Sequence, residues 1–435
     1  MTESAPTRVR RLVVTTREVE PFEDVLAHAE PTHPLAWLRR GEGMVGVGSP
    51  RLIEVGGHRA NPADGNQAAV LADAWRATAA AATVDDEVRL PGTGLIAFGA
   101  LSFDPSSASA STLIVPQFVF GRRAGRSWVT TIHRAGRETP DIPSAPPWGP
   151  AWSATVGPGE LDAPGYQAAV RAGLEAIAAG EVSKVVLARD LIGSVPAGAD
   201  LRRLVRALAT GYPDVWTYAV DGIIGASPET LVTVSGGTIT ARVLAGTAPR
   251  GADADGDTEA SVALSASGKD QDEHRFAVES VLRTLRPHTS ALTASEQPFA
   301  LKLPNVWHLA TDVEGIVAAG VSALDLVGVL HPTAAVAGTP TTSALEVIRR
   351  IEPFDRGRYA GPVGWIDASG DGEWAIALRS AQFGDAAEPT QNGWVTRETR
   401  AVTAHAGAGI VPGSDPEAEL LETRMKFRPI VDALA

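Results

Sequence analysis

The chain has 435 residues, of which 44% are apolar, 38 are basic and 51 are acidic, so its formal net charge is −13. This size supports one large or two intimate domains, and the acidic balance argues against nucleic acid and anionic membranes as partners. The sequence has no cysteine and no apolar run long enough for a membrane span. Disulfide and thiol chemistry are therefore excluded, and a cytoplasmic protein is the simplest expectation.

The N-terminal part, residues 1–150, contains short strand-like runs at Leu95–Ala100 and Thr112–Phe120. It contains no catalytic pattern. A proline-rich segment, Thr139–Pro150, is typical of a connection to the part that follows.

The first functional candidate is a lysine in a predicted strand. An amphipathic helix at 164–179 ends at Gly180, and the β-branched run Ser183–Arg189 follows. In a strand, Lys184 shares one face with Val186 and Ala188. A lysine there is costly unless it is paired or neutralised. The chain has four lysines and 34 arginines, and lysine, unlike arginine, can lose its proton in a protein.

Two connections follow. A predicted helix, 201–210, and strand, 216–220, lead to Glu229, which comes directly after Pro228. The next strand, 238–244, ends in a predicted turn, Ala245–Arg250, that offers backbone N–H groups and a hydroxyl. An acidic loop is expected at 251–257.

The next pattern predicts one long helix from about residue 259 to 285. Asp270 and Glu273 are three residues apart on it and share a face. His274 is adjacent in sequence and points elsewhere.

A second carboxylate pair lies near the C-terminus. The stretch Ala406–Lys426 opens with a predicted glycine-rich turn, and a helix begins at Ser414–Pro416. Glu419 and Glu422 share a face of this helix with Lys426. Two facing carboxylate pairs would suit Mg²⁺ rather than zinc. The alternative for each pair is a solvated helix face.

Between the two pairs, Gly370–Gly372 predicts a hairpin, followed by a strand that ends in Arg379. An arginine there can form a fork for a carboxylate. His308 or Tyr359 alone would more often be structural.

Taken in order, these patterns resemble the chorismate-utilising enzymes: isochorismate, salicylate, anthranilate and aminodeoxychorismate synthases. The resemblance covers residues 166–433 and rests on the ordered motifs K-V-V-L-A-R, G-A-S-P-E, A-G-T-A-P-R-G, S-G-K-D-Q-D-E-H, H-P-T-A-A-V-A-G-T-P, Y-A-G-P-V-G-W and A-G-A-G-I-V. It implies an α+β fold, a large body of two packed antiparallel sheets surrounded by helices. Residues 1–150 would contribute strands to this body, and residues 155–433 would form the chorismate-binding catalytic domain.

The resemblance also implies a role for each candidate. Lys184 would be the general base and Glu229 the general acid. The implied Mg²⁺ ligands are Glu273 and Glu422, with Asp270 and Glu419 nearby. The implied substrate contacts are Gly246, Thr247, His308, Ala335, Tyr359, Arg379, Gly407, Gly409 and Lys426.

Two residues favour one reaction within the family. A lysine at position 184 is typical of members that use water rather than ammonia, and water must lose a proton as it attacks. Ala335 stands where pyruvate-releasing members typically have threonine. We therefore expect a Mg²⁺-dependent, monomeric isochorismate synthase that acts on chorismate without a glutaminase subunit, in menaquinone or siderophore biosynthesis. The alternatives are a salicylate synthase, an amine-transferring synthase and a non-catalytic chorismate-binding protein.

Overall fold

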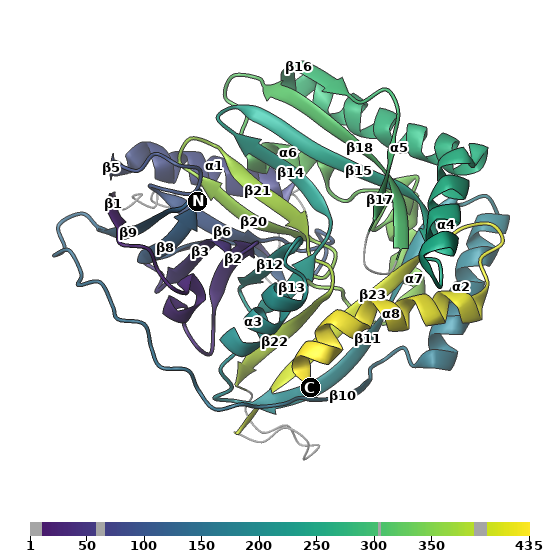
Figure 1. The fold of residues 1–435 in the computed structure, drawn as a ribbon, viewed down its shortest axis with the longest axis horizontal. Helices are drawn as coiled ribbons and strands as arrows, with labels where there is room; N and C mark the ends of the chain where they lie inside the picture. Colours follow the sequence, from purple (N-terminus) through teal and green to yellow (C-terminus); the bar gives the residue numbers. More distant parts are fainter. Residues whose placement is uncertain (1–10, 58–65, 303–305, 387–397) are drawn as a thin grey trace, which may run out of the picture.

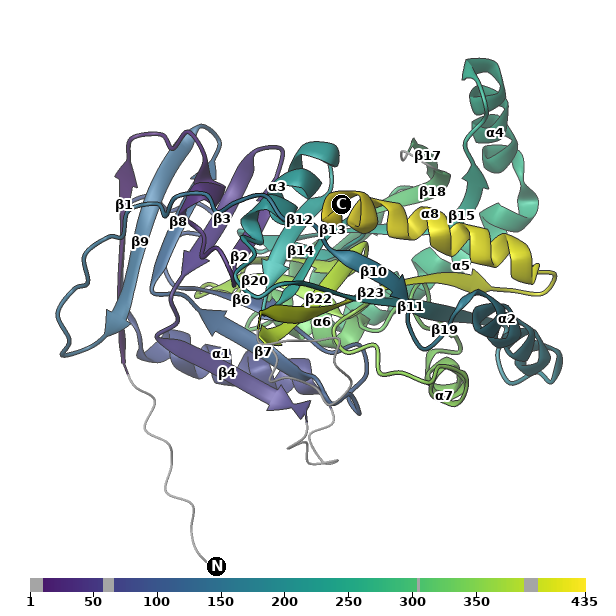
Figure 2. The ribbon, with the colours of Figure 1, turned by 90° about the horizontal axis from the view of Figure 1, so that it is seen from below.

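The structure is a computed structural model that describes residues 11–57, 66–302, 306–386 and 398–435. Two large β-sheets, sheet A and sheet B, pack on each other, and helices lie on their outer faces (Figures 1 and 2). The α+β class predicted from the sequence is confirmed by this arrangement.

Sheet A contains thirteen strands within the described residues, and all its pairings are antiparallel except β1 with β5. In spatial order they are β10 (Thr155–Pro158), β11 (Lys184–Pro196), β23 (Thr399–Ile410), β22 (Ser380–Ala386), β13 (Ile223–Ser227), β12 (Trp216–Val220), β2 (Leu35–Arg39), β3 (Glu42–Val47), β8 (Phe118–Arg123), β9 (Arg126–Arg134), β1 (Leu12–Val19) and β5 (Thr83–Asp86), with β19 (Gly338–Thr339) beside β11.

Sheet B has ten antiparallel strands in the described part of the chain. Their order is β16 (Thr289–Ala294), β18 (Val306–Val317), β15 (Thr238–Pro249), β14 (Thr230–Ser235), β21 (Gly372–Ile376), β20 (Pro362–Asp367), β6 (Ile96–Ala100), β7 (Ala110–Val115) and β4 (Arg51–Gly56), with β17 (Phe299–Lys302) beside β18. In both sheets, strands from residues 1–150 pair directly with strands from the rest of the chain.

The helices lie outside the sheets. They are α1 (Gln67–Ala81), α2 (Ala163–Ala178), α3 (Arg202–Gly211), α4 (Ala254–Ala266), α5 (Gly268–Leu285), α6 (Ala323–Leu330), α7 (Thr341–Ile351) and α8 (Pro416–Leu434), with 3₁₀ turns at Val25–His28 and Arg286–His288. Helices α3 and α8 pack on sheet A, whereas α1, α5 and α6 pack on sheet B (Figure 2). No helix among the described residues is long and apolar enough to cross a membrane.

Large aromatic side chains from both sheets fill the space between the layers. Trp37 and Tyr218 come from sheet A, and Phe98 and Trp365 come from sheet B; all four are fully buried. The indole N–H groups of Trp37 and Trp365 donate to the carboxylate of Glu373, at 2.9 and 3.0 Å. This shared acceptor satisfies two buried donors that would otherwise be costly.

Several of the predicted elements are wrong in their detail. The run predicted at Thr112–Phe120 is divided between β7 of sheet B and β8 of sheet A, and α4 begins at Ala254, inside the loop predicted at 251–257. All but the last residue of the turn predicted at Ala245–Arg250 belong to β15, which continues through a β-bulge to Pro249. The glycine-rich turn at 406–409 is part of β23. The single helix predicted at 259–285 is two helices, because Ser267 both ends α4 and caps α5.

Candidate active site

Strands β11 and β23 supply the floor of the site. They pair so that Val186 lies opposite Gly409 and Ala188 opposite Gly407. Lys184, Val186 and Ala188 share one face, as predicted, and the two glycines lie on the same face. A Cβ atom on Gly409 would lie 3.1 Å from Cε and 3.7 Å from Nζ of Lys184. The lysine side chain therefore lies directly over a glycine.

The opposite face of β11 packs under helix α8. There the Arg189 guanidinium donates to the Thr423 hydroxyl at 2.8 Å and lies 5.0 Å from the centre of the Phe427 ring. Lys184 and Arg189 therefore lie on different faces of β11.

Glu229 and Arg379 lie on two connections that run side by side between the sheets. Glu229 joins β13 of sheet A to β14 of sheet B, and Arg379 joins β21 of sheet B to β22 of sheet A. Ile376 N donates to Glu229 O (3.0 Å), and Ala226 N donates to Arg379 O (3.2 Å). The predicted strand therefore ends at Ile376 rather than at Arg379, whose left-handed φ of 51° lets the chain turn between the sheets.

The Glu229 carboxyl lies within the electrostatic reach of three cations. Burial raises the pKa of Glu229, and the charges of Lys184, Arg379 and Lys426 oppose that rise. A carboxyl that favours its protonated form is suited to donate a proton. The surrounding cations are suited to hold an anionic ligand beside it.

Tyr359 connects Arg379 to the strand floor. It is 8% exposed and lies just before β20. Burial raises the pKa of its phenol to about 12, although Arg356, Arg379 and a hydrogen bond with the backbone of Gly407 oppose the rise. The phenol is therefore neutral at physiological pH and can take part in hydrogen bonds as donor or acceptor.

Helix α8 begins as predicted. The Asp415 carboxylate accepts hydrogen bonds from Glu417 N (3.1 Å) and Ala418 N (2.9 Å), and Pro416 is the first helical residue. This start sets the helical phase that places Glu419, Glu422 and Lys426 toward the site.

Lys426 ties α8 to the floor of the site. Its ammonium donates to Gly407 O at 2.8 Å and pairs with Glu422 at 2.5 Å. Burial lowers the pKa of Lys426, and the Glu422 carboxylate raises it. Burial also raises the pKa of Glu419, as does the negative charge of Glu422. Because the negative charges of Glu419 and Glu422 repel each other, a cation that binds between the two carboxylates would be favourable.

The opposite wall comes from β15, β18 and the start of α5. At the bulge in β15, Gly246 has a φ of +77°, and a Cβ atom there would lie 3.2 Å from Cβ of Asp270. His274 fixes α5 in this position, because its Nδ1 lies 3.1 Å from Ala245 O and its Nε2 lies 2.7 Å from Thr311 Oγ1. The His274 ring is thus held between β15 and β18.

His308 on β18 pairs with position 247 of β15. Burial, with a contribution from the charges of Lys426 and Arg379, lowers its pKa to about 4. His308 is therefore a neutral imidazole that lies near the cations of the site.

The structure brings some of the predicted metal ligands together and leaves others apart. Glu419 and Glu422 are neighbours on α8, and Asp270 accepts a short hydrogen bond from the Ser267 hydroxyl. The side chains of Thr247 and Glu273 lie outside the described part of the structure. Among the described side chains, no group of three or more His, Asp or Glu residues is arranged to hold a metal ion.

Ala335 is exposed in the turn that precedes β19. This turn reaches β11 a few residues later, where Ala337 O accepts from Val186 N at 2.9 Å and Thr339 pairs with Lys184. Ala335 is thus close in the chain to the segment that borders the lysine.

Sequence reasoning missed a buried ion pair beneath the floor. Glu352 and Arg356 pair at 2.6 Å. Glu352 accepts from Ala188 N (2.7 Å), and Arg356 donates to Val186 O (2.7 Å). A glutamate and an arginine four residues apart can form an ion pair on a helix. Helix α7 ends at Ile351, however, so no helical pattern in the sequence indicated this pair.

Three comparisons identify the family. The family model for "Chorismate binding enzyme" matches residues 149–435. Isochorismate synthase DhbC of Bacillus subtilis (strain 168) is 39% identical over 281 residues, covering 62% of this chain and 67% of DhbC. The solved structure of DhbC from Bacillus anthracis is 30% identical with a TM-score of 0.72, covering 94% of this chain and 98% of that one.

A further solved structure, menaquinone-specific isochorismate synthase MenF from Escherichia coli, has the same fold at 24% identity and a TM-score of 0.72, covering 98% of this chain and 95% of that one. The family match spans β10 to α8 and includes every strand and helix that carries a predicted site residue. The chain belongs to the chorismate-binding enzyme family.

Proposed function

We propose that this protein is an isochorismate synthase that interconverts chorismate and isochorismate. The observation that carries the proposal is that the half-buried Glu229 lies within the electrostatic reach of Lys184, Arg379 and Lys426. DhbC of Bacillus subtilis and EntC of Escherichia coli (strain K12), at 39% and 37% identity, both carry the name isochorismate synthase.

In the proposed reaction, water forms a bond to ring C2 and gives a proton to the Lys184 amine. The two ring double bonds shift, the C4–O bond breaks, and Glu229 gives a proton to the departing hydroxyl, which leaves as water. One water enters and one leaves, so no oxidant or reductant is needed. An acid and a base on separate elements permit the exchange without a covalent intermediate.

We assign the anionic groups of chorismate to the cationic side of the site. Arg379, with Tyr359 beside it, would hold one carboxylate. Lys426, anchored on Gly407 O, would contribute to holding the other. Gly246, Thr247, Gly409 and His308 would border the ring. Ala335, in the turn before β19, would allow release of isochorismate before pyruvate is lost.

We further propose that Mg²⁺ binds to carboxylates of α8 and α5. The oxygen donors fit this ion, because Glu419 and Glu422 repel each other when both are ionised and hard oxygen ligands are what Mg²⁺ prefers. Glu422 and Glu273 would bind directly, with Asp270 and Glu419 nearby. When bound, Mg²⁺ would neutralise the ring carboxylate of the substrate.

The test is product analysis with the purified chain alone, which also tests the proposal that no glutaminase subunit is required. With chorismate and Mg²⁺ at near-neutral pH, chromatography should show isochorismate, and a chelator should abolish turnover until Mg²⁺ is restored. Early stoichiometric pyruvate would make the protein a salicylate synthase instead. Chorismate binding without any turnover would make it a non-catalytic binding protein.

A further inference from the structure

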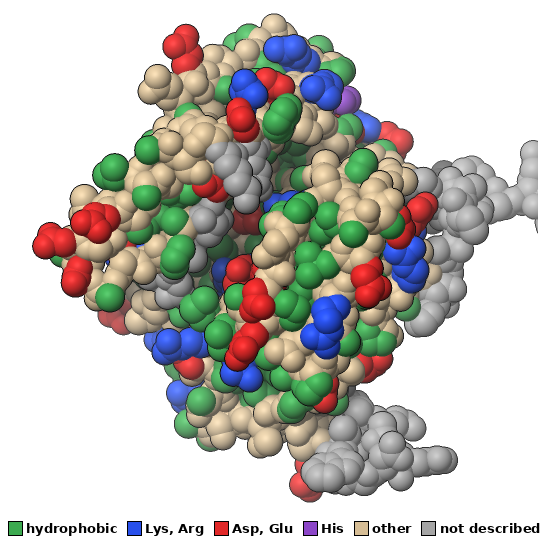
Figure 3. All heavy atoms as spheres, turned by 90° about the vertical axis from the view of Figure 1, so that its right-hand side faces the viewer, with side chains coloured by type: hydrophobic (Ala, Val, Ile, Leu, Met, Phe, Trp, Pro, Cys, Tyr) green, Lys and Arg blue, Asp and Glu red, His purple; other side chains and the backbone are tan. Residues whose placement is uncertain are grey.

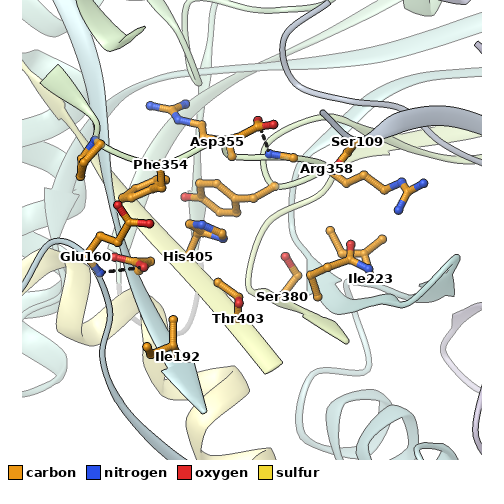
Figure 4. Close-up of a pocket in the computed structure, with 16 residues that line it drawn as sticks. Ser109, Glu160, Ile192, Ile223, Phe354, Asp355, Arg358, Ser380, Thr403 and His405 are labelled. Carbon is orange, nitrogen blue, oxygen red and sulfur yellow. Dashed lines mark hydrogen bonds between the residues drawn. The ribbon is translucent and has the colours of Figure 1, made fainter. Parts of the chain in front are cut away.

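A cavity lies beside the candidate active site, on the same strand face. It has a volume of about 470 Å³ and is lined by residues of β11, β13, β22 and β23 and of the segment between α7 and β20 (Figure 4). Cavities of this size hold small ligands. No residue proposed above for proton transfer or metal binding lines it.

The register of β11 and β23 explains why the two spaces are neighbours. At one end of the paired strands, Gly407 and Gly409 have no side chains, so the strand face there is left open for the candidate active site. Farther along, His405 lies opposite Asp190 and Thr403 lies opposite Ile192, and these four line the cavity. One strand face therefore carries both spaces.

Tyr359 forms the boundary between them. Its ring stacks on the ring of His405, with centroids 5.1 Å apart and planes 23° apart. Its phenol has a hydrogen bond with the backbone of Gly407 on the other side. A ligand that contacts His405 would therefore act on a side chain that also borders the substrate.

His405 is a polar side chain with unused hydrogen-bonding groups. It is 8% exposed, and its ring contacts are with Tyr359 and Phe354, both at 5.1 Å. Within the described residues, neither ring nitrogen has a hydrogen bond. A buried imidazole without a partner is costly unless water or a ligand supplies one, and this ring lines the cavity (Figure 4).

Three carboxylates make the cavity wall acidic. Asp190 accepts from the backbone N–H groups of Glu160 and Leu161, each at 3.0 Å. Asp355 accepts from Ser107 Oγ and two backbone N–H groups. The Glu160 side chain is exposed, extends toward Phe354 and His405 (Figure 4), and has no ion pair in the described part of the chain.

The two arginines of the wall do not offset this charge, because each is already paired. Arg356 is neutralised by Glu352, and the Arg358 guanidinium pairs with Asp221 and donates to Ala110 O at 3.0 Å. The cavity therefore attracts cations. The carboxylates are not grouped as metal ligands among the described side chains, and Phe354, Ile192 and Ile223 supply apolar surface. A compact metal ion would leave that surface unused.

We propose that this cavity binds a small organic cation, an ammonium group carried on a flat apolar body, and that its occupancy strengthens chorismate binding through the stacked His405–Tyr359 pair. The ammonium would lie near Glu160 and Asp190, and a polar group of the ligand would bind the free edge of His405. The bound cation and the anionic substrate would attract each other across Tyr359. Reciprocity then requires that each ligand raise the affinity of the other by the same factor.

The test uses tyramine as the probe and 3-(4-hydroxyphenyl)propionate, which replaces the ammonium with a carboxylate, as the matched analogue. Calorimetry with the full chain should show one saturable tyramine site, at least tenfold weaker binding of the carboxylate, and weaker tyramine binding in Glu160→Gln but not in Glu175→Gln on the outside of α2. Chorismate and tyramine should each raise the affinity of the other, by equal factors of about two or more.

Equal binding of the two analogues, or no saturation at millimolar tyramine, would overturn the site. Tyramine binding that leaves chorismate affinity unchanged would overturn the coupling. Glu160→Gln should keep its basal activity, so a loss of tyramine binding there cannot be attributed to a damaged catalytic site. Because tyramine binding is measured without turnover, failure of the proposed isomerase activity would be seen separately.

Discussion

The proposed role of Lys184 depends on a proton, and arginine can test this. Lys184→Arg keeps the positive charge but removes a group that can deprotonate. If Lys184 is the base, kcat should fall by the ~10²–10⁴-fold typical of losing such a group, with little change in chorismate affinity. The control is Lys302→Arg, because Lys302 pairs with Asp257 at 3.2 Å and lies over the ring of Trp307, and arginine can keep both contacts. Near-normal kcat in Lys184→Arg would refute the base assignment.

Gly409 offers a test of how Lys184 is placed. In Gly409→Ala the new Cβ would lie 3.1 Å from Lys184 Cε, so the lysine must shift by a few tenths of an ångström. Because small displacements of catalytic groups are costly, we expect kcat to fall about tenfold while the melting temperature stays constant. Gly157→Ala in β10, where a Cβ would meet no atom within 4 Å, is the control. Equal activity of both variants would show that Lys184 is not constrained by the floor.

Some of these residue positions could be predicted from the sequence. Alternation along β11 placed Lys184 with Val186 and Ala188, and Pro228 marked the connection that carries Glu229. The glycines at 407 and 409 were misread, because glycine usually signals a turn. Here they lie in a strand, and the need for glycine comes from Lys184 and from the backbone of Leu187, which are distant in sequence.

At the scale of elements, the buried Glu352–Arg356 pair should hold the floor in place. It joins the segment after α7 to the backbone of β11 on either side of Leu187. Glu352→Gln leaves Arg356 buried without an anion, which should lower the free energy of unfolding by about 3 kcal/mol or more. Glu181→Gln breaks the exposed pair with Arg350 and should cost about 1 kcal/mol or less.

Urea denaturation of both variants measures this difference. A loss in Glu352→Gln no larger than in Glu181→Gln would mean that the buried pair does not stabilise the floor.

The helices and strands were easier to predict than the points at which one ends and the next begins. Helices α2 and α8 and the strand at 216–220 follow clear periodicity or capping signals. The break between α4 and α5 was missed, because Ser267, whose hydroxyl caps α5, lies inside a continuous helical pattern. The cavity beside Tyr359 could not be predicted either, because it depends on the pairing of β11 with β23, about 200 residues away in sequence.

At the scale of the whole molecule, stability should depend on pH through buried histidine. His405 is 8% exposed, and burial lowers the pKa of its imidazole to about 4 from the usual 6.5, although Asp190 and Asp355 oppose the shift. In the unfolded chain the imidazole takes up a proton as the pH falls through about 6.5. In the folded chain it is protonated only as the pH falls to about 4. This contribution to stability is therefore complete above about pH 6.5 and is lost as the pH falls to about 4.

From pH 7 to pH 5 the loss due to His405 should be about 2 kcal/mol. Other groups titrate in the same range, so the quantity to measure is the difference between variants in urea denaturation at the two pH values. His405→Phe keeps an aromatic ring against Tyr359 and cannot be protonated, so it should lose about 2 kcal/mol less than the wild type on acidification. His133→Phe on β9 should lose as much as the wild type. If the His405→Phe protein loses as much stability as the wild type, the imidazole is not held neutral by burial, and the unpartnered state of this ring in the cavity wall would have to be reconsidered.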